Sequence, residues 1–113
     1  MGLKKTNHLV KKFNQVLPEA YAYIVECKVG RSTGYAIIGI FSNRADASNH
    51  MIEPYERIRV DFDVNRTESA FVTAYLEAKK PLFSKVWNTE TKSLQETVVD
   101  ERFSVGWEDD IIY

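Results

Sequence analysis

The sequence has few residues that could build a reactive site or a covalent framework. Its 113 residues include one cysteine, Cys27, and two histidines, His8 and His50. A single cysteine excludes an internal disulfide framework and is typical of a reducing compartment. Metal sites need clustered cysteine, histidine or carboxylate ligands, and these three residues lie far apart in the chain. We therefore expect no metal and no other cofactor.

A long hydrophobic segment is also missing. The longest uncharged apolar run, residues 35–41, has strand length and falls far short of the roughly 20 residues that cross a bilayer. Lys4 and Lys5 are followed by no apolar stretch of signal-peptide length, because Lys11 and Lys12 interrupt the pattern. The sequence predicts a cytoplasmic protein without a membrane partner.

No linker or repeat divides the chain. Its length, with 44% hydrophobic and 27% charged residues, fits one globular domain over residues 1–113. The net charge of −1 conceals an asymmetry, since residues 1–31 carry +4, residues 32–94 are balanced and residues 95–113 carry −5. The basic head and the acidic tail could bind different partners, or they could lie against each other in the fold.

Helical spacing of apolar residues predicts a first helix over residues 9–17. Thr6 or Asn7 is available as its N-cap, and Pro18 ends the run. Lysines would occupy the solvent-exposed face of this amphipathic helix.

Two more helices are expected further along. The first, capped by Ser42 or Asn43, is predicted to bury an inner stripe of Ala47, Met51 and Ile52. The second starts at a capping box formed by Asn65 and Glu68. Its predicted inner stripe comprises Ala70, Phe71, Ala74, Tyr75 and Ala78.

Alternating side chains predict the strands. Residues 21–29 and 35–41, joined by a glycine-containing turn, form a β-hairpin whose first strand has five residues on one side: Tyr21, Tyr23, Val25, Cys27 and Val29. Residues 55–64 alternate an apolar face with a charged one, made of Arg57, Arg59, Asp61 and Asp63. Residues 82–87 and 94–99 suggest a second hairpin, and residues 102–107 a last strand.

The predicted order is therefore α-β-β-α-β-α-β-β-β. Hairpins need only short turns, and the strands do not alternate regularly with helices. We expect an α+β two-layer sandwich, in which an antiparallel sheet of five to six strands has its helices on one face.

Side chains that could act as catalysts have simpler structural explanations. Asp61 and Asp63 could bind Mg²⁺ or act as acid and base, but Arg57 and Arg59 on the same strand face would neutralise them. Cys27 lies in mid-strand, where a cysteine is usually a small core residue. We therefore predict a protein that is not an enzyme.

The acidic end of the chain is the first candidate binding site. Its apolar and acidic side chains could dock into a basic groove of another protein, or compete for a nucleic-acid channel. The tail could equally be an edge strand, or pack on the basic head. The residues of this site are Trp107, Glu108, Asp109, Asp110 and Tyr113. Arg57 and Arg59 on the charged strand are further candidate binding residues.

Lysines near the N-terminus could instead contact nucleic acid. Lys4, Lys5, Lys11 and Lys12 form the one basic cluster of the sequence, and phosphate groups attract such clusters. A sequence pI of 6.1 opposes this interpretation, since nucleic-acid-binding domains usually exceed a pI of about 9.

Residues 21–64 resemble small β-β-α-β modules of uncharacterised bacteriophage and bacterial proteins. The resemblance lies in the hairpin, the junction Ile40-Phe41-Ser42-Asn43, the helix start Asp46-Ala47 and the charged strand. It covers less than half of the chain, and no residue role transfers with it. It implies an accessory factor that binds and blocks a host enzyme or a defence complex, as anti-CRISPR proteins do.

The combined prediction is a non-catalytic protein-binding module, an inhibitor or adaptor that acts on a host enzyme or a nucleoprotein complex. Three alternatives stay open: a nucleic-acid-binding accessory protein, a virion or tail component, and a small enzyme built from His50, Asp61 and Asp63. The sequence does not determine the oligomeric state, and a homodimer is among the options.

Overall fold

A computed structural model describes residues 2–64 and 69–110, and of residues 82–86 and 95–100 it describes the backbone alone. Within these residues the chain forms seven strands and two helices. In chain order they are β1 (Gly2–Val10), β2 (Gln15–Val29), β3 (Thr33–Phe41), α1 (Arg44–Ala47), β4 (Glu56–Asp63), α2 (Ala70–Ala78), β5 (Leu82–Asn88), β6 (Ser93–Asp100) and β7 (Glu108–Asp110).

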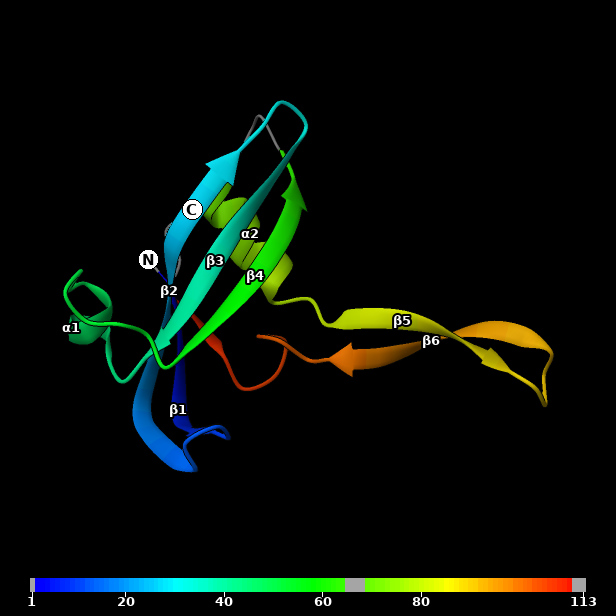
Figure 1. The fold of residues 1–113 in the computed structure, drawn as a ribbon, viewed down its shortest axis with the longest axis horizontal. Coiled ribbons are helices and arrows are strands. Elements are labelled where there is room, and N and C mark those ends of the chain that lie inside the picture. Colours follow the sequence, from blue (N-terminus) through cyan, green and yellow to red (C-terminus); the bar gives the residue numbers. More distant parts are fainter. Residues whose placement is uncertain (1, 65–68, 111–113) are drawn as a thin grey trace.

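Five strands form one antiparallel sheet in the order β4-β3-β2-β1-β7. Among the described residues, β5 and β6 pair only with each other. This hairpin, residues 82–100, projects away from the five-stranded sheet (Figure 1), and we call it the arm. The structure is therefore mostly antiparallel sheet with a few helices, broadly as the predicted α+β class requires, but the second hairpin does not join the main sheet.

The predicted first helix is wrong, because residues 9–17 belong to a β-hairpin. Leu9 pairs with Val16 across a turn at residues 11–14. Asn14 has a φ of 49°, a left-handed conformation that asparagine tolerates better than most residues. Apolar residues on both sides of a four-residue turn recur at intervals that imitate a helical stripe, which explains the error. Pro18 does not end an element but lies within β2.

The main core lies between one face of the sheet and α2. Side chains from β2, β3 and β4 pack there against Ala74, Tyr75 and Ala78 of the helix. The prediction that five residues from Tyr21 to Val29 share one side of β2 is wrong. Ala22 and Ile24 face this core and Cys27 also packs against it, whereas Tyr21 belongs to a separate buried cluster. A register shift between Ile24 and Glu26 then inserts an extra residue, so the strand changes its pattern at this bulge.

The opposite face of the sheet is covered by α1 at one end, where Ala47 packs with Tyr21 and Phe41. The helices therefore lie on both faces, not on one. Asn43 caps α1 as predicted, accepting a hydrogen bond from the amide of Asp46 at 2.8 Å. Because the helix ends at Ala47, the predicted inner residues Met51 and Ile52 are exposed.

The second helix is confirmed, with Ser69 as its N-cap. The predicted capping box, Asn65 and Glu68, lies outside the described residues. Ala74, Tyr75 and Ala78 are buried as predicted, whereas Phe71 is 49% exposed. The hairpin over residues 82–100 is also confirmed.

The predicted strand at residues 102–107 is wrong. These residues form a loop whose two aromatic side chains are nevertheless buried, Phe103 at 1% and Trp107 at 8% exposure, whereas Val105 is 59% exposed. The loop closes one end of the core and leads into β7. Burial of aromatic residues therefore occurs here without strand pairing.

Candidate functional site

The acidic tail is an edge strand. Glu108 to Asp110 form β7, which pairs with β1 so that Glu108 lies opposite Lys4 and Asp110 opposite Gly2. Trp107 packs against Phe103, with ring centroids 5.0 Å apart. Of the two explanations left open by the charge asymmetry, the structure therefore shows the second, with basic head and acidic tail side by side. Tyr113 lies outside the described residues.

Two of the three tail acids are held by partners within the chain. The Tyr21 hydroxyl donates a hydrogen bond of 2.6 Å to Asp110, and Arg44 of α1 lies 3.7 Å from the same carboxylate oxygen. The bond from Tyr21 lowers the pKa of Asp110. Asp109 forms an ion pair of 2.5 Å with Lys79, at the end of α2. The tail therefore joins β7 to both helices.

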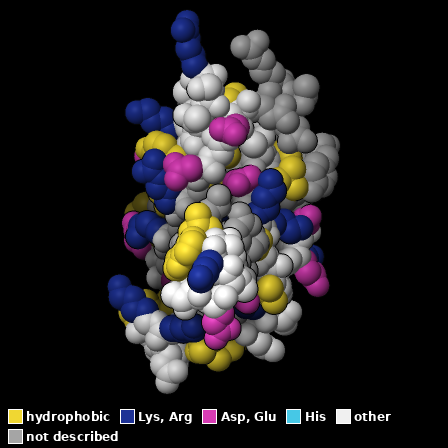
Figure 2. Space-filling model, turned by 90° about the vertical axis from the view of Figure 1, so that its right-hand side faces the viewer, with side chains coloured by type: hydrophobic (Ala, Val, Ile, Leu, Met, Phe, Trp, Pro, Cys, Tyr) yellow, Lys and Arg dark blue, Asp and Glu magenta, His cyan; other side chains and the backbone are white. Residues whose placement is uncertain are grey.

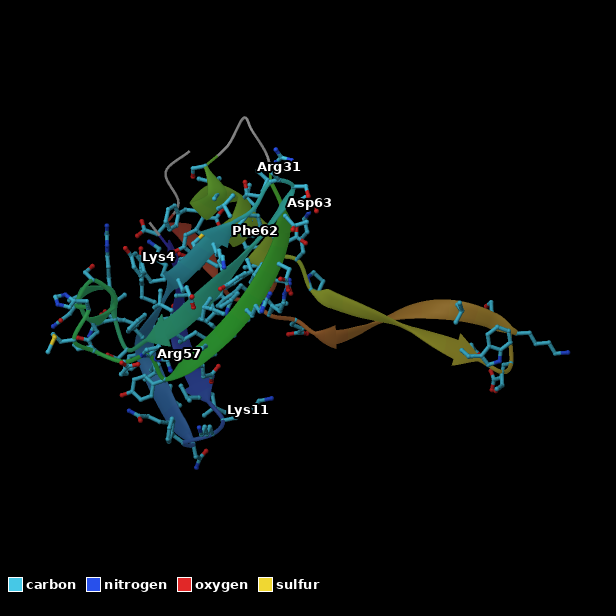
Figure 3. All side chains as sticks on the ribbon, turned by 45° about the horizontal axis from the view of Figure 1, so that its top comes forward. Lys4, Lys11, Arg31, Arg57, Phe62 and Asp63 are labelled. Carbon is cyan, nitrogen blue, oxygen red and sulfur yellow. The ribbon has the colours of Figure 1, made fainter. Side chains whose placement is uncertain are left out.

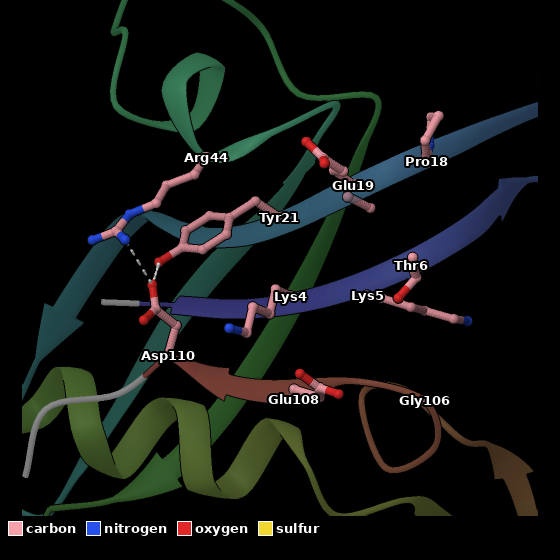
Figure 4. Close-up of a pocket in the computed structure, with 11 residues that line it drawn as sticks. Lys4, Lys5, Thr6, Pro18, Glu19, Tyr21, Arg44, Gly106, Glu108 and Asp110 are labelled. Carbon is pink, nitrogen blue, oxygen red and sulfur yellow. Dashed lines mark hydrogen bonds and ion pairs between the residues drawn. The ribbon is translucent and has the colours of Figure 1, made fainter.

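Beside this tail lies an open groove of about 430 Å³ (Figure 4). Its charged lining residues carry both signs: Lys4, Lys5, Arg44, Glu19, Glu108 and Asp110. Opposite charges that line one groove reduce its net field, and the described lining residues include neither cysteine nor histidine. The groove offers polar and charged groups of both signs for binding.

Arg57 and Arg59 lie on β4, which forms the opposite edge of the five-stranded sheet from β7. Arg57 forms an ion pair with Glu53. Arg59 forms one of 3.1 Å with Asp61 and stacks 4.3 Å from the ring centre of Tyr35. The predicted neutralisation of Asp61 by an arginine is confirmed. The two sets of predicted binding residues do not form one site.

The residues of the hypothetical small enzyme are not brought together. His50 lines one groove of the sheet surface, whereas Asp61 and Asp63 line another. Within the described part of the chain, no group of three or more histidine, cysteine, aspartate or glutamate residues is placed to hold a metal ion.

The expected lysine-bearing helix does not exist. Lys4 and Lys5 are neighbours on β1 and point to opposite faces of the sheet, while Lys11 and Lys12 occupy the turn. Figure 3 shows Lys4, Lys11, Arg31 and Arg57 distributed widely over the body. On the face shown in Figure 2, basic and acidic side chains are interspersed. The lysines therefore do not share one helical face, and the nucleic-acid hypothesis stays a prediction.

His8 is a feature that the sequence did not reveal. Its side chain is 14% exposed and lies beside Trp107, with ring centroids 5.2 Å apart. Neither ring nitrogen has a hydrogen-bond partner in the described structure. Burial lowers the pKa of His8, and the charge of Lys5 lowers it further. The Glu56 carboxylate, 4.0 Å away, favours the protonated form but does not outweigh these effects.

We expect this histidine to make the protein less stable in acid. Its folded-state pKa lies below the ordinary value of 6.5, so the unfolded chain binds more protons between the two values. The free energy of unfolding should therefore fall as the pH drops below about 6.5 and level off once the folded-state pKa is passed. Urea unfolding at a series of pH values between 8 and 5 measures this dependence.

Two variants separate His8 from the other titrating groups. His8→Phe should flatten this part of the profile, whereas His50→Gln, at an exposed position, should leave it unchanged. An unaltered slope in His8→Phe would show that other groups cause the dependence.

The arm is the second feature that the sequence did not reveal. Trp87 and Leu94 lie opposite each other near its outer end, and they are 57% and 62% exposed. The pattern of residues 82–100 predicted the hairpin, but alternation along two strands does not show whether they join a larger sheet. The radius of gyration, 15.8 Å, exceeds the roughly 13 Å of a compact domain of this length.

Comparison with protein family models, with curated proteins and with solved structures found no match. The fold and surfaces therefore define only a class, a mostly antiparallel α+β protein with a projecting β-arm. Neither helix of the described chain is long and apolar enough to span a bilayer. The resemblance to bacteriophage and bacterial modules stays a prediction.

Proposed function

We propose that this protein is a non-catalytic protein-binding module and that the arm is its main binding element. The observation that carries the proposal is the exposed pair Trp87 and Leu94 on a hairpin that pairs with no other described strand. A two-stranded hairpin alone is marginally stable in water, and a third strand or another packed element stabilises it. Packing against another protein would supply that element.

Tryptophan at the end of the arm fits this role. Interfaces draw most of their binding energy from a few side chains, and tryptophan is enriched among them. By contrast, Trp107 is already buried and Asp109 and Asp110 are paired within the chain. The tail is therefore a weaker candidate than the sequence suggested, and the arm takes its place.

An inhibitor or adaptor of a host enzyme or nucleoprotein complex stays our expectation for the biological role. The mechanism is occlusion by shape and surface charge. The same arm also favours a second candidate, a structural component such as a virion or tail protein, because such components act through repeated contacts between copies.

The proposal is tested by affinity capture from cells that produce the protein. The double variant Trp87→Ser/Leu94→Ser should lose the partners that the wild type retains, copies of the chain included. Phe13→Ser is the matched control, since Phe13 is 54% exposed but lies on the body, in the β1–β2 turn. If the double variant retains every partner, the arm is not the binding element.

A further inference from the structure

We infer that the arm of one molecule packs on the body of a second copy of this chain, in a groove between β2 and the start of α2. The inference rests on the proposed function of the arm and names its partner. Three observations carry it: the exposed area of the chain, the character of the groove, and the direction of the arm.

The chain exposes more surface than its mass requires. A compact protein of 13.0 kDa exposes about 6,300 Å², whereas this chain exposes 7820 Å². The excess is roughly 1,500 Å² for one chain, about twice the roughly 800 Å² that each partner buries in a standard interface. If each copy uses both its arm and its groove, two contact surfaces of about 800 Å² each would account for this excess.

The receiving groove is lined mainly by aromatic side chains, and none of its described lining residues carries a charge. Its volume is about 260 Å³, and its lining residues are Tyr23, Ile24, Ser69, Phe71 and Tyr75. Phe71 is 49% exposed, and neighbouring Val25, at the bulge of β2, is 44% exposed. Exposed apolar residues that gather at one place mark interaction sites. An indole and a leucine side chain are the groups that such a groove accepts.

A second exposed apolar cluster on the body is a poorer receiver. It lies at the β1–β2 turn and includes Phe13, whose ring already packs edge-on against Tyr55, with centroids 6.1 Å apart. The ammonium group of Lys12 covers the same ring at 5.6 Å. The groove at Phe71 carries no such cover among the described residues.

The direction of the arm prevents it from docking in the groove of its own molecule. In Figure 1 the arm leaves the body and points away from it, so that its outer end is remote from β2 and the start of α2. Trp87 can therefore reach a groove of this kind only on another molecule. A second copy provides that groove whenever the protein is present.

The test measures assembly mass by light scattering and sedimentation velocity across a wide range of protein concentration. Wild-type protein should form oligomers that dissociate on dilution. The arm variant Trp87→Ser/Leu94→Ser and the groove variant Val25→Thr/Phe71→Ser should each be monomeric. The four substituted side chains are 44–62% exposed, so both variants should keep the fold, which circular dichroism checks. Phe13→Ser should assemble like the wild type.

Mixing the two defective variants gives the sharpest result. The groove variant has an intact arm and the arm variant an intact groove, so the mixture should form heterodimers although neither variant associates alone. The mass of the wild-type assembly reports the symmetry: a closed dimer means reciprocal exchange of arms, and a larger species means a head-to-tail series.

Three outcomes would overturn the inference: a monomeric wild type at every concentration, an arm variant that still assembles, or a mixture that stays monomeric. The first outcome, a monomeric wild type, can be distinguished from failure of the proposed function. A monomeric wild type that still captures other proteins through Trp87 leaves the arm as a binding element and excludes only the second copy. Loss of both properties excludes both proposals.

Discussion

Trp107→Ala should lower the free energy of unfolding by about 3–5 kcal/mol, as expected when a large buried aromatic side chain is truncated. Trp107 is 8% exposed and packs against Phe103 and His8. The ammonium group of Lys5 lies 5.8 Å from its ring centre. Removal of the indole would open the core where the 101–107 loop meets β1. Urea or thermal unfolding followed by circular dichroism measures the loss.

The chain contains its own control for this prediction. Trp87→Ala removes the same side chain at a position that is 57% exposed, where substitutions usually change stability by no more than about 0.5 kcal/mol. The two substitutions should therefore have different effects: Trp107→Ala should lower stability, and Trp87→Ala should weaken binding. Equal losses of stability in both variants would contradict the buried position of Trp107.

Tyr75→Phe is expected to cost about 1–3 kcal/mol, because it removes a hydroxyl that satisfies a buried backbone donor. The amide of Ile24 donates to this hydroxyl at 2.8 Å. Ile24 lies just beyond Ala22, the last residue of β2 in register with β1. The side chain of α2 thus supplies the acceptor that a neighbouring strand would otherwise provide. Without it, the amide is buried and unpaired.

Tyr23→Phe is the matched control, since the same hydroxyl is removed from a residue that is 38% exposed. Urea unfolding should show little change for this variant. Hydrogen exchange at the Ile24 amide should accelerate in Tyr75→Phe and not in Tyr23→Phe. Equal stability of the two variants would show that water or another group replaces the lost bond.

Elements defined by short-range patterns were predictable from the sequence. The hairpin of residues 21–41, the alternation of β4 and, except for Phe71, the inner stripe of α2 appear in the structure. In each case the pattern is continuous over one element and fits one periodicity. Residues 9–17 failed this condition, because a four-residue turn between apolar strand ends produced a spacing that also fits a helix.

The candidate site was less predictable than the fold. The sequence identified the tail by its composition, but Asp109 and Asp110 find their partners on α2, β2 and α1, which lie far away in the chain. Nothing local distinguishes an acidic residue that is paired from one that is free. Similarly, Trp107 and Trp87 are the same residue type, and only long-range packing buries one and exposes the other.

The sequence by itself determined the low content of reactive side chains, the antiparallel character of the chain and most of its hairpins, because these depend on composition and on contacts between near neighbours. The tertiary structure alone decided that β7 pairs with β1 and that the arm leaves the main sheet. Both depend on which distant surfaces pack together. That packing is set by the shape of the whole core, and no single segment of the sequence specifies this shape.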